Sequence, residues 1–190
     1  MREQVIAWLK KEVPPARLRH ILGVEQMAIE LAKTHQIDQK RAAQAGLMHD
    51  LAKYFPPDKL LQIAQNNGVK IDSILQDNPR LLHANVSAIV AQQEFGIQDQ
   101  EVLDAIGNHT LGRPQMSKLS CVIFVADALE PNRGDNPQLA KMRQVSVTNL
   151  YKSVWQTCDY SLKYLLDTRR SIHPRAILTR NWAMQESSQT

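Results

Sequence analysis

The stretch from Ala42 to Lys53 constrains the fold most, because small side chains there precede an adjacent imidazole and carboxylate. If the stretch is helical, positions 42, 45, 46, 49, 50 and 53 share one face. The small residues at its start allow a second helix to approach closely, and His49, Asp50 and Lys53 then face one cavity. For the dipeptide alone, a buried histidine bonded to its neighbour is the simpler explanation. The rest of the chain must therefore show whether His49 and Asp50 are structural residues or part of a functional site.

Helical periodicity and helix-ending residues account for most of the chain. Only 7 glycines and 5% aromatic residues argue against a β-sandwich or barrel. The apolar run 122–125 has the composition of a buried strand, but its length and helical neighbours favour a buried helix. Helices are predicted at about 2–12, 15–34, 42–53, 57–67, 78–96, 99–112, 119–130, 146–169 and 174–184.

The predicted fold is an all-α helical bundle in a single domain, 1–190, with a core at about 16–169 and a C-terminal helix at about 174–184. Asp99 and Ser117 are expected to cap the helices that follow them. The long helix 146–169 is expected to bury Leu150, Val154, Cys158, Ser161 and Leu165.

Ionisable side chains recur on the apolar faces of separate predicted helices. They are His20, His49 with Asp50, His83, His109 and Asp127. One such residue is usually a hydrogen-bonded core residue, but buried ionisable groups are costly unless they are paired or bind a metal. Because these residues recur on the inward faces of several helices, they are predicted to form one functional site. His35 and His173 lie near segment ends and are expected to be surface or capping residues.

Charge and cysteine content exclude several classes of protein. The net charge of +4 is spread along the chain, so no basic stripe for nucleic acid is visible. Cys121 and Cys158 form no CxxC pattern, which argues against a disulfide framework or a thiolate zinc site. The charged N-terminus is not a signal peptide, and no apolar run is long enough to span a bilayer. We expect a cytoplasmic protein without a membrane partner.

The order of the inward residues resembles that of the HD-domain phosphohydrolase superfamily, particularly its two-metal members. The segments 109–117 and 123–133 resemble the YqeK-type family, the bacterial symmetrical diadenosine tetraphosphate hydrolases. Shorter similar stretches are 19–24, 45–53, 81–84, 172–174 and 180–181. The fold that this resemblance implies is an HD-domain helical bundle.

The chain departs from the family pattern at three places. Leu111 stands where a second Thr is usual, Ala84-Asn85 stand where Gly-Pro is common, and Ser120-Cys121 replace an acidic-basic pair. All metal-ligand positions are kept. These departures therefore concern substrate contacts and rate more than metal binding.

The resemblance implies two metal ions. His20, His49, Asp50 and Asp127 would hold one ion, and Asp50 would bridge to a second ion held by His83 and His109. A bridging carboxylate suits two cations about 3.5–4 Å apart. The resemblance implies iron, whereas imidazole and carboxylate ligands without thiolate also suit manganese or similar metals.

Phosphate contacts are predicted at Lys53, Thr110, Arg113 and Arg133, with the solvated surface cation as the alternative for each basic residue. His20 is also placed among the substrate-binding residues. Asp50, Lys53 and Arg113 are the predicted catalytic residues.

Three functions compete. The first is a dinuclear hydrolase that cleaves dinucleoside tetraphosphates, such as diadenosine tetraphosphate, to two nucleoside diphosphates. The second is another HD-domain reaction, as nucleotidase, phosphodiesterase or oxygenase, and the third is a non-catalytic nucleotide-binding or assembly protein. The segment 109–133 favours the first function, and the complete ligand set argues against the third. The expected partner is a nucleotide substrate, and a homodimer is compatible with the sequence.

Overall fold

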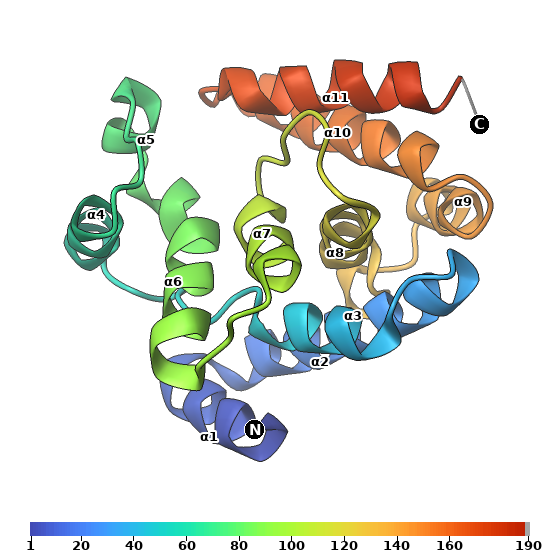
Figure 1. Ribbon diagram of the computed structural model, residues 1–190. Helices are drawn as coiled ribbons and strands as arrows, with labels where there is room; N and C mark the ends of the chain where they lie inside the picture. Colours follow the sequence, from blue (N-terminus) through green and yellow to red (C-terminus); the bar gives the residue numbers. More distant parts are fainter. Residues whose placement is uncertain (189–190) are drawn as a thin grey trace.

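Figure 1 shows the computed structural model, which describes residues 1–188 of the predicted domain; residues 189 and 190 lie outside the described part. The predicted all-α fold is confirmed, since residues 1–188 contain helices and no strand. The elements are α1 (Arg2–Glu12), α2 (Pro15–Thr34), α3 (Gln39–Met48), α4 (Pro57–Asn66), α5 (Ser73–Asp77), the 3-10 helix η1 (Pro79–Leu82), α6 (His83–Phe95), α7 (Gln100–Asn108), α8 (Lys118–Leu129), the 3-10 helix η2 (Pro131–Arg133), α9 (Pro137–Ser146), α10 (Leu150–Asp167) and α11 (Pro174–Glu186). Within the described residues, no helix is both long and apolar enough to cross a membrane.

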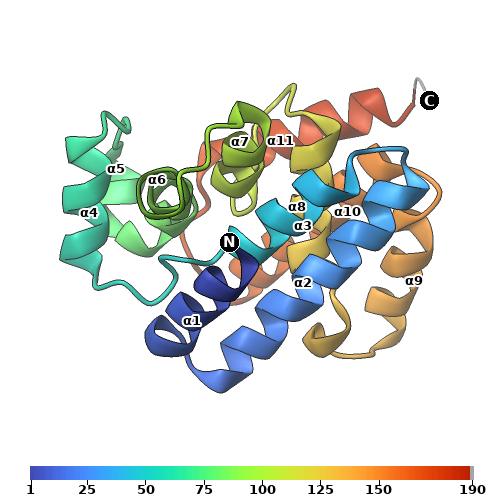
Figure 2. The same ribbon diagram turned by 60° about the horizontal axis from the view of Figure 1, so that its bottom comes forward.

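Helix α8 lies at the centre of the bundle, in contact with α2, α3, α7 and α10 (Figure 1). Its apolar run is buried, with Val122, Ile123 and Val125 fully inaccessible to solvent. Helices α4, α5 and α6 flank one side, and α10 packs with α11 as an outer layer (Figures 1 and 2). The run 122–125 is therefore the buried helix that the sequence predicts.

Helix starts follow local capping chemistry. Asp99 accepts hydrogen bonds from the backbone N–H groups of Glu101 and Val102, and Ser117 accepts one from Ser120. These contacts confirm both predicted caps, which satisfy N–H groups that the helix itself leaves free. The caps fix where α7 and α8 begin, and thereby the phase of α7, which ends next to His109, and of α8, which carries Asp127.

The row of small residues in α3 brings α2 and α3 together. Ala42, Ala45 and Gly46 are buried against α2. A Cβ atom at Gly46 would lie only 3.0 Å from the Cα atom of Glu25, which is tighter than nearly all real contacts. The predicted close approach is confirmed, and it places His20 of α2 beside the end of α3.

The structure corrects the predicted helix over 42–53. Helix α3 ends at Met48, and residues 49–54 follow as successive turns. His49 occupies the C-cap position, where its ring Nδ1–H donates to the carbonyl of Gly46 at 2.7 Å. This bond occupies a carbonyl that would otherwise accept from the next helical turn, so the helix ends at the metal-ligand candidates.

Two further predictions are wrong in the C-terminal half. Helix α10 starts at Leu150 rather than at about 146, because Asn149 caps it through the backbone N–H of Lys152, and residues 137–146 form a further helix, α9, for which the sequence made no prediction. Ser161 is exposed and Leu165 is only half-buried, whereas the other residues expected to face inward are buried. The last two turns of α10 extend beyond the core, where they form part of a cavity wall.

Candidate metal centre

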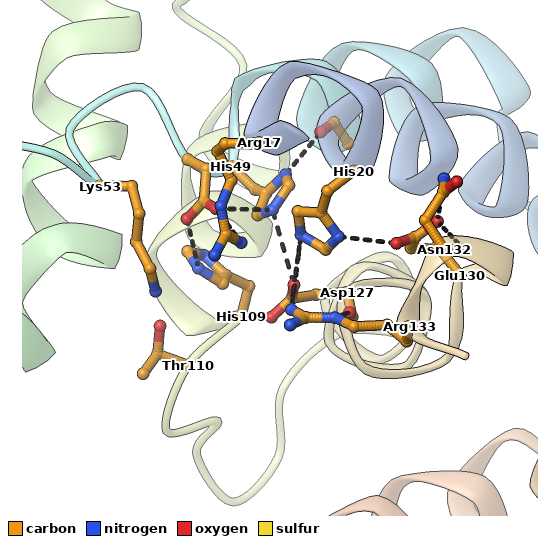
Figure 3. A network of polar contacts seen from close by, with 12 residues as sticks. Arg17, His20, His49, Lys53, His109, Thr110, Asp127, Glu130, Asn132 and Arg133 are labelled. Carbon is orange, nitrogen blue, oxygen red and sulfur yellow. Dashed lines mark hydrogen bonds and ion pairs between the residues drawn. The ribbon is translucent and has the colours of Figure 1, made fainter. Parts of the chain in front are cut away.

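Five segments bring the six predicted metal ligands together. Figure 3 shows His20, His49, His109 and Asp127 of this group beneath α2. His20 comes from the middle of α2, the pair His49-Asp50 from the end of α3, and His83 from the start of α6. His109 follows α7, and Asp127 lies in α8. The five residues other than Asp127 are all buried, with His49 and Asp50 at most 1% exposed.

Three of the imidazoles are held in the same way, through a backbone carbonyl three residues earlier. The Nδ1 atoms of His49, His83 and His109 lie 2.7, 2.6 and 2.7 Å from the carbonyl oxygens of residues 46, 80 and 106. A carbonyl can only accept, so each Nδ1 carries the proton. In each neutral ring the lone pair is then on Nε2.

These Nε2 atoms point at one another and at carboxylate oxygens. The Nε2 atoms of His83 and His109 are 3.0 Å apart, and His20 Nε2 is 3.0 Å from Asp127 Oδ1. Two lone pairs, or a lone pair and a carboxylate oxygen, repel each other unless a cation or proton lies between them. The arrangement therefore requires positive charge at its centre.

The two oxygens of Asp50 face different imidazoles. Oδ1 lies 3.4 Å from His83 Nε2 and 3.6 Å from His109 Nε2. Oδ2 lies 3.5 Å from His49 Nε2, on the side where Asp127 and His20 also lie. This division gives one carboxylate a position between two groups of imidazoles, as bridging between two ions requires.

The donor set fits divalent cations. His20, His49 and Asp50 offer ligand atoms within 4.8 Å of one another, and so do Asp50, His83 and His109. Among the described residues, His49 Nε2 and Asp50 Oδ1 are buried without a hydrogen bond partner. Buried polar atoms are normally satisfied, so these two are available to a metal ion. The cluster is thus compatible with binding of divalent metal ions.

The electrostatics agree with this fit. Burial acts to raise the pKa of Asp50 and Asp127, but neighbouring histidines, and Arg133 for Asp127, hold the pKa of both well below the usual range. Burial lowers the pKa of His109 to about 4, so its ring is neutral and able to ligate near neutral pH. For His49, burial acts to lower the pKa, but Asp50 and Asp127 raise it above its ordinary value. The carboxylates thus favour a cation in the centre.

Basic side chains surround the centre. Lys53 Nζ lies 3.0 Å from His83 Nε2, and the hydroxyl of Thr110 lies 3.2 Å from the same atom. Arg133 contacts Asp127 Oδ1 at 2.6 Å, and Arg17 contacts Asp50 Oδ2 at 3.1 Å. Figure 3 shows Lys53 and Thr110 on one side of the imidazoles and Arg133 beneath Asp127. Three of the four predicted phosphate contacts are therefore beside the centre.

Arg113 is not brought to the centre. Its side chain is half-exposed, and its guanidinium donates to Asp104 at 2.8 Å. It borders a shallow surface hollow between α6 and α7 that contains none of the six candidate ligands. This position does not support Arg113 as a catalytic residue or a phosphate contact.

A cavity of about 420 Å³ opens directly onto the centre at Lys53, His83 and Thr110. Its opposite wall consists of the end of α10 and the segment before α11, with these side chains among its lining residues: Tyr160, Tyr164, Leu165, Arg170 and His173. A second hollow of about 400 Å³ contains Arg17, Lys53 and Arg80. Lys53 and Arg80 border both spaces.

Sequence reasoning missed several of these residues. Arg17 precedes His20 by three positions on α2, so helical spacing alone could have placed it on the same face. Glu130, which contacts His20, belongs to the segment 123–133 but carried no signal of its own. Arg80 and Tyr160 show no pattern, because the cavity joins segments that are distant in sequence. Leu111, one of the departures, is part of the cavity lining.

Comparison with known proteins agrees with this description. The family model of the HD domain matches residues 17–132, the part of the chain from Arg17 to Asn132 that holds all six candidate ligands. The chain therefore belongs to the HD-domain family. It is similar to proteins of Bacillus subtilis and Halalkalibacterium halodurans that are named "Bis(5'-nucleosyl)-tetraphosphatase, symmetrical". The identities are 37% over 98% of this chain and 99% of the first relative, and 34% over 97% and 98% for the second.

The fold comparison leads to the same family. A crystal structure from Clostridium acetobutylicum, described as a predicted HD superfamily hydrolase involved in NAD metabolism, superposes with a TM-score of 0.93. The two sequences are 32% identical, and the match covers 98% of each chain. The predicted HD-domain helical bundle in a single domain is confirmed.

Proposed function

We propose that this protein is a dinuclear metal-dependent hydrolase that cleaves dinucleoside tetraphosphates, such as diadenosine tetraphosphate, symmetrically to two nucleoside diphosphates. The observation that carries this proposal is Asp50, whose two oxygens face two separate groups of imidazoles next to an open cavity. The names of the relatives in Bacillus subtilis and Halalkalibacterium halodurans support the reaction and its symmetry.

Two ions are proposed, one at His20, His49, Asp50 and Asp127, the other at Asp50, His83 and His109. When bound, such a pair of cations lowers the pKa of water and neutralises phosphoryl oxygens. We propose iron, because the resemblance to the YqeK-type family implies it; the donor set of imidazole and carboxylate without thiolate suits iron and manganese alike. Metal analysis of protein purified without added metal tests this assignment.

The chain's own cations position the polyphosphate. Lys53 and Thr110 lie at the edge between the centre and the cavity, where they can donate to phosphoryl oxygens. The Arg133 guanidinium lies 3.4 Å from His20 Nε2, on the opposite side of the imidazoles, and we propose Arg133 and His20 as further substrate contacts. Arg17 and Arg80 add positive charge around Lys53. Phosphoryl transfer depends mainly on such positioning and charge, so these residues are assigned to phosphate binding.

Two spaces lie beside Lys53, and each can hold one of the two nucleosides of a symmetrical substrate. The larger cavity offers Tyr160 and Tyr164 to one nucleoside, and the hollow at Arg17 has Tyr54 for the other. A tetraphosphate that runs past Lys53 and Arg80 then brings its central bond to the metal centre. This placement agrees with a central cut, because one nucleoside can be held on each side of Lys53.

Turnover of diadenosine tetraphosphate in oxygen-18 water tests the proposed function. The expected product is ADP alone, with one labelled oxygen in half of the molecules, because water enters one fragment at each cleavage. ATP and AMP in equal amounts would reject symmetrical cleavage. Inactivity toward this substrate in metal-loaded protein, with turnover of another nucleotide, would favour the alternative of a different HD-domain nucleotidase or phosphodiesterase.

The proposed setting is the cytoplasm, and its reducing conditions agree with two buried free thiols at Cys121 and Cys158. Neither nucleic acid nor a membrane is a proposed partner. A homodimer is the proposed assembly, since apolar side chains of α10 and α11 are exposed, among them Leu166 and Leu178. Sedimentation analysis tests this assembly.

A further inference from the structure

His20 is not held in the way that the other three imidazoles are held. The Nδ1 atoms of His49, His83 and His109 each contact the backbone carbonyl three residues earlier. His20 lies inside α2 and makes no such contact with a carbonyl of its own helix. Its Nδ1 atom instead lies 2.9 Å from Oε1 of Glu130.

Glu130 is itself fixed on all sides. Its side chain is fully buried, and its Oε2 accepts from both the backbone N–H and the side-chain amide of Asn132, each at 2.8 Å. Gly23 of α2 leaves the space that this carboxylate fills, because a Cβ atom at Gly23 would collide with Oε2. The carboxylate therefore uses both oxygens as acceptors and has little freedom to turn.

We propose that Glu130 is the positioning residue of the metal centre: it keeps the proton of His20 on Nδ1 and aims the Nε2 lone pair at the ion shared with His49, Asp50 and Asp127. A carboxylate behind a ligating histidine fixes the tautomer and makes the imidazole a stronger ligand. This inference rests on the proposed metal centre, but not on the identity of the substrate.

The geometry separates this role from that of a ligand or catalytic residue. Figure 3 shows the His20 ring between the two carboxylates, with Asp127 on its Nε2 side and Glu130 with Asn132 on its Nδ1 side. Glu130 therefore faces away from the metal positions. It also belongs to neither of the spaces assigned to the substrate.

The variant Glu130→Gln tests the proposal, because an amide offers only one acceptor oxygen. If that oxygen accepts from His20, the new NH2 group opposes the donors of Asn132. If the amide turns, its NH2 group faces Nδ1 and forces the proton onto Nε2, where the metal must bind. Glu25→Gln is the matched control. Glu25 is a buried carboxylate on α2, the helix of His20, but it pairs with Arg2 and lies outside the centre.

The measurement is the affinity for Zn²⁺ and for Mn²⁺, each titrated alone against a competing chelator. In Glu130→Gln, one of the two ions is expected to bind about ten- to a hundredfold more weakly, while the other keeps its affinity. In Glu25→Gln both affinities stay at the wild-type value. A general loss of stability would lower the melting temperature without selecting one ion. Equal affinities in both variants would overturn the proposal.

A second measurement and a second variant keep the proposal testable if Glu130→Gln does not fold. In wild-type protein loaded with diamagnetic Zn²⁺, nitrogen NMR should find the His20 proton on Nδ1; a proton on Nε2 would overturn the proposal. Gly23→Ala favours the helix but displaces the carboxylate, so it should weaken the same single ion. Wild-type protein that binds two ions yet cleaves no diadenosine tetraphosphate would reject the proposed function alone and leave the role of Glu130 intact.

Discussion

The buried metal centre and the wall of the neighbouring cavity differ in how their side chains are held. In the centre, each imidazole is fixed through Nδ1 by a carbonyl or by Glu130, and the rings are almost completely buried. In the wall, Tyr164 is 53% exposed, with the Arg170 guanidinium 5.6 Å from its ring centroid. Fixed ligands suit binding of small ions in one geometry, whereas a more exposed wall leaves room for a large substrate to enter and leave.

The comparison predicts that variants of the centre change metal content and rate, and that variants of the wall change KM. Asp50→Ala should have the largest effect, because its carboxylate faces both groups of imidazoles. Both metal ions and all activity above background should be lost, and the melting temperature should fall, since bound ions stabilise the native state. Elemental analysis measures this loss. Full occupancy in the variant would reject Asp50 as the bridging ligand.

Within the centre, His109→Ala should remove only one ion. His109 belongs to the group with Asp50 and His83, while the other ion keeps its own imidazoles. The expected metal content is therefore close to half of the wild-type value, with activity strongly reduced because both cations contribute to charge neutralisation. Loss of both ions in this variant would show that the two halves bind cooperatively rather than separately.

At the border between the two regions, Lys53→Met should lower kcat/KM by about ten- to a hundredfold, the size expected for a charge-assisted hydrogen bond of about 1.5–3 kcal/mol. The metal content should remain unchanged, because Lys53 contacts His83 but is not one of the six candidate ligands. Lys40→Met is the control, since Lys40 is exposed at the start of α3. A variant that loses metal would place Lys53 in the centre instead.

In the wall, Tyr160→Leu should raise KM by roughly five- to tenfold and leave kcat and metal content unchanged. Stacking of a base on an aromatic ring contributes about 1–3 kcal/mol, and a leucine retains part of the apolar contact. Steady-state kinetics with diadenosine tetraphosphate measures the change. An effect on kcat alone would mean that Tyr160 acts on the reaction rather than on nucleoside binding.

The difference between the buried centre and the exposed wall also explains which residues could be predicted from the sequence. His20, His83, His109 and Asp127 were found because an ionisable residue on an apolar helical face is costly and periodic. The helix end at Met48 was missed, since it depends on the bond from His49 to a carbonyl that helical periodicity does not reveal. The wall was missed because it joins η1 to the end of α10 and the segment before α11. Half-exposed residues in such an arrangement share no spacing.

Arg113→Lys is the variant with the smallest expected effect. For this variant, the prediction from the sequence and the expectation from the structure differ most. The sequence predicts a bidentate phosphate contact, which Lys cannot replace, and hence a loss of about ten- to a hundredfold in kcat/KM. In the structure, Arg113 pairs with Asp104 at the surface, and such exposed pairs contribute about 0–1 kcal/mol. We therefore expect kcat/KM to stay within about twofold of wild type. A tenfold loss with intact metal content would mean that the loop after α7 carries Arg113 to the substrate during turnover.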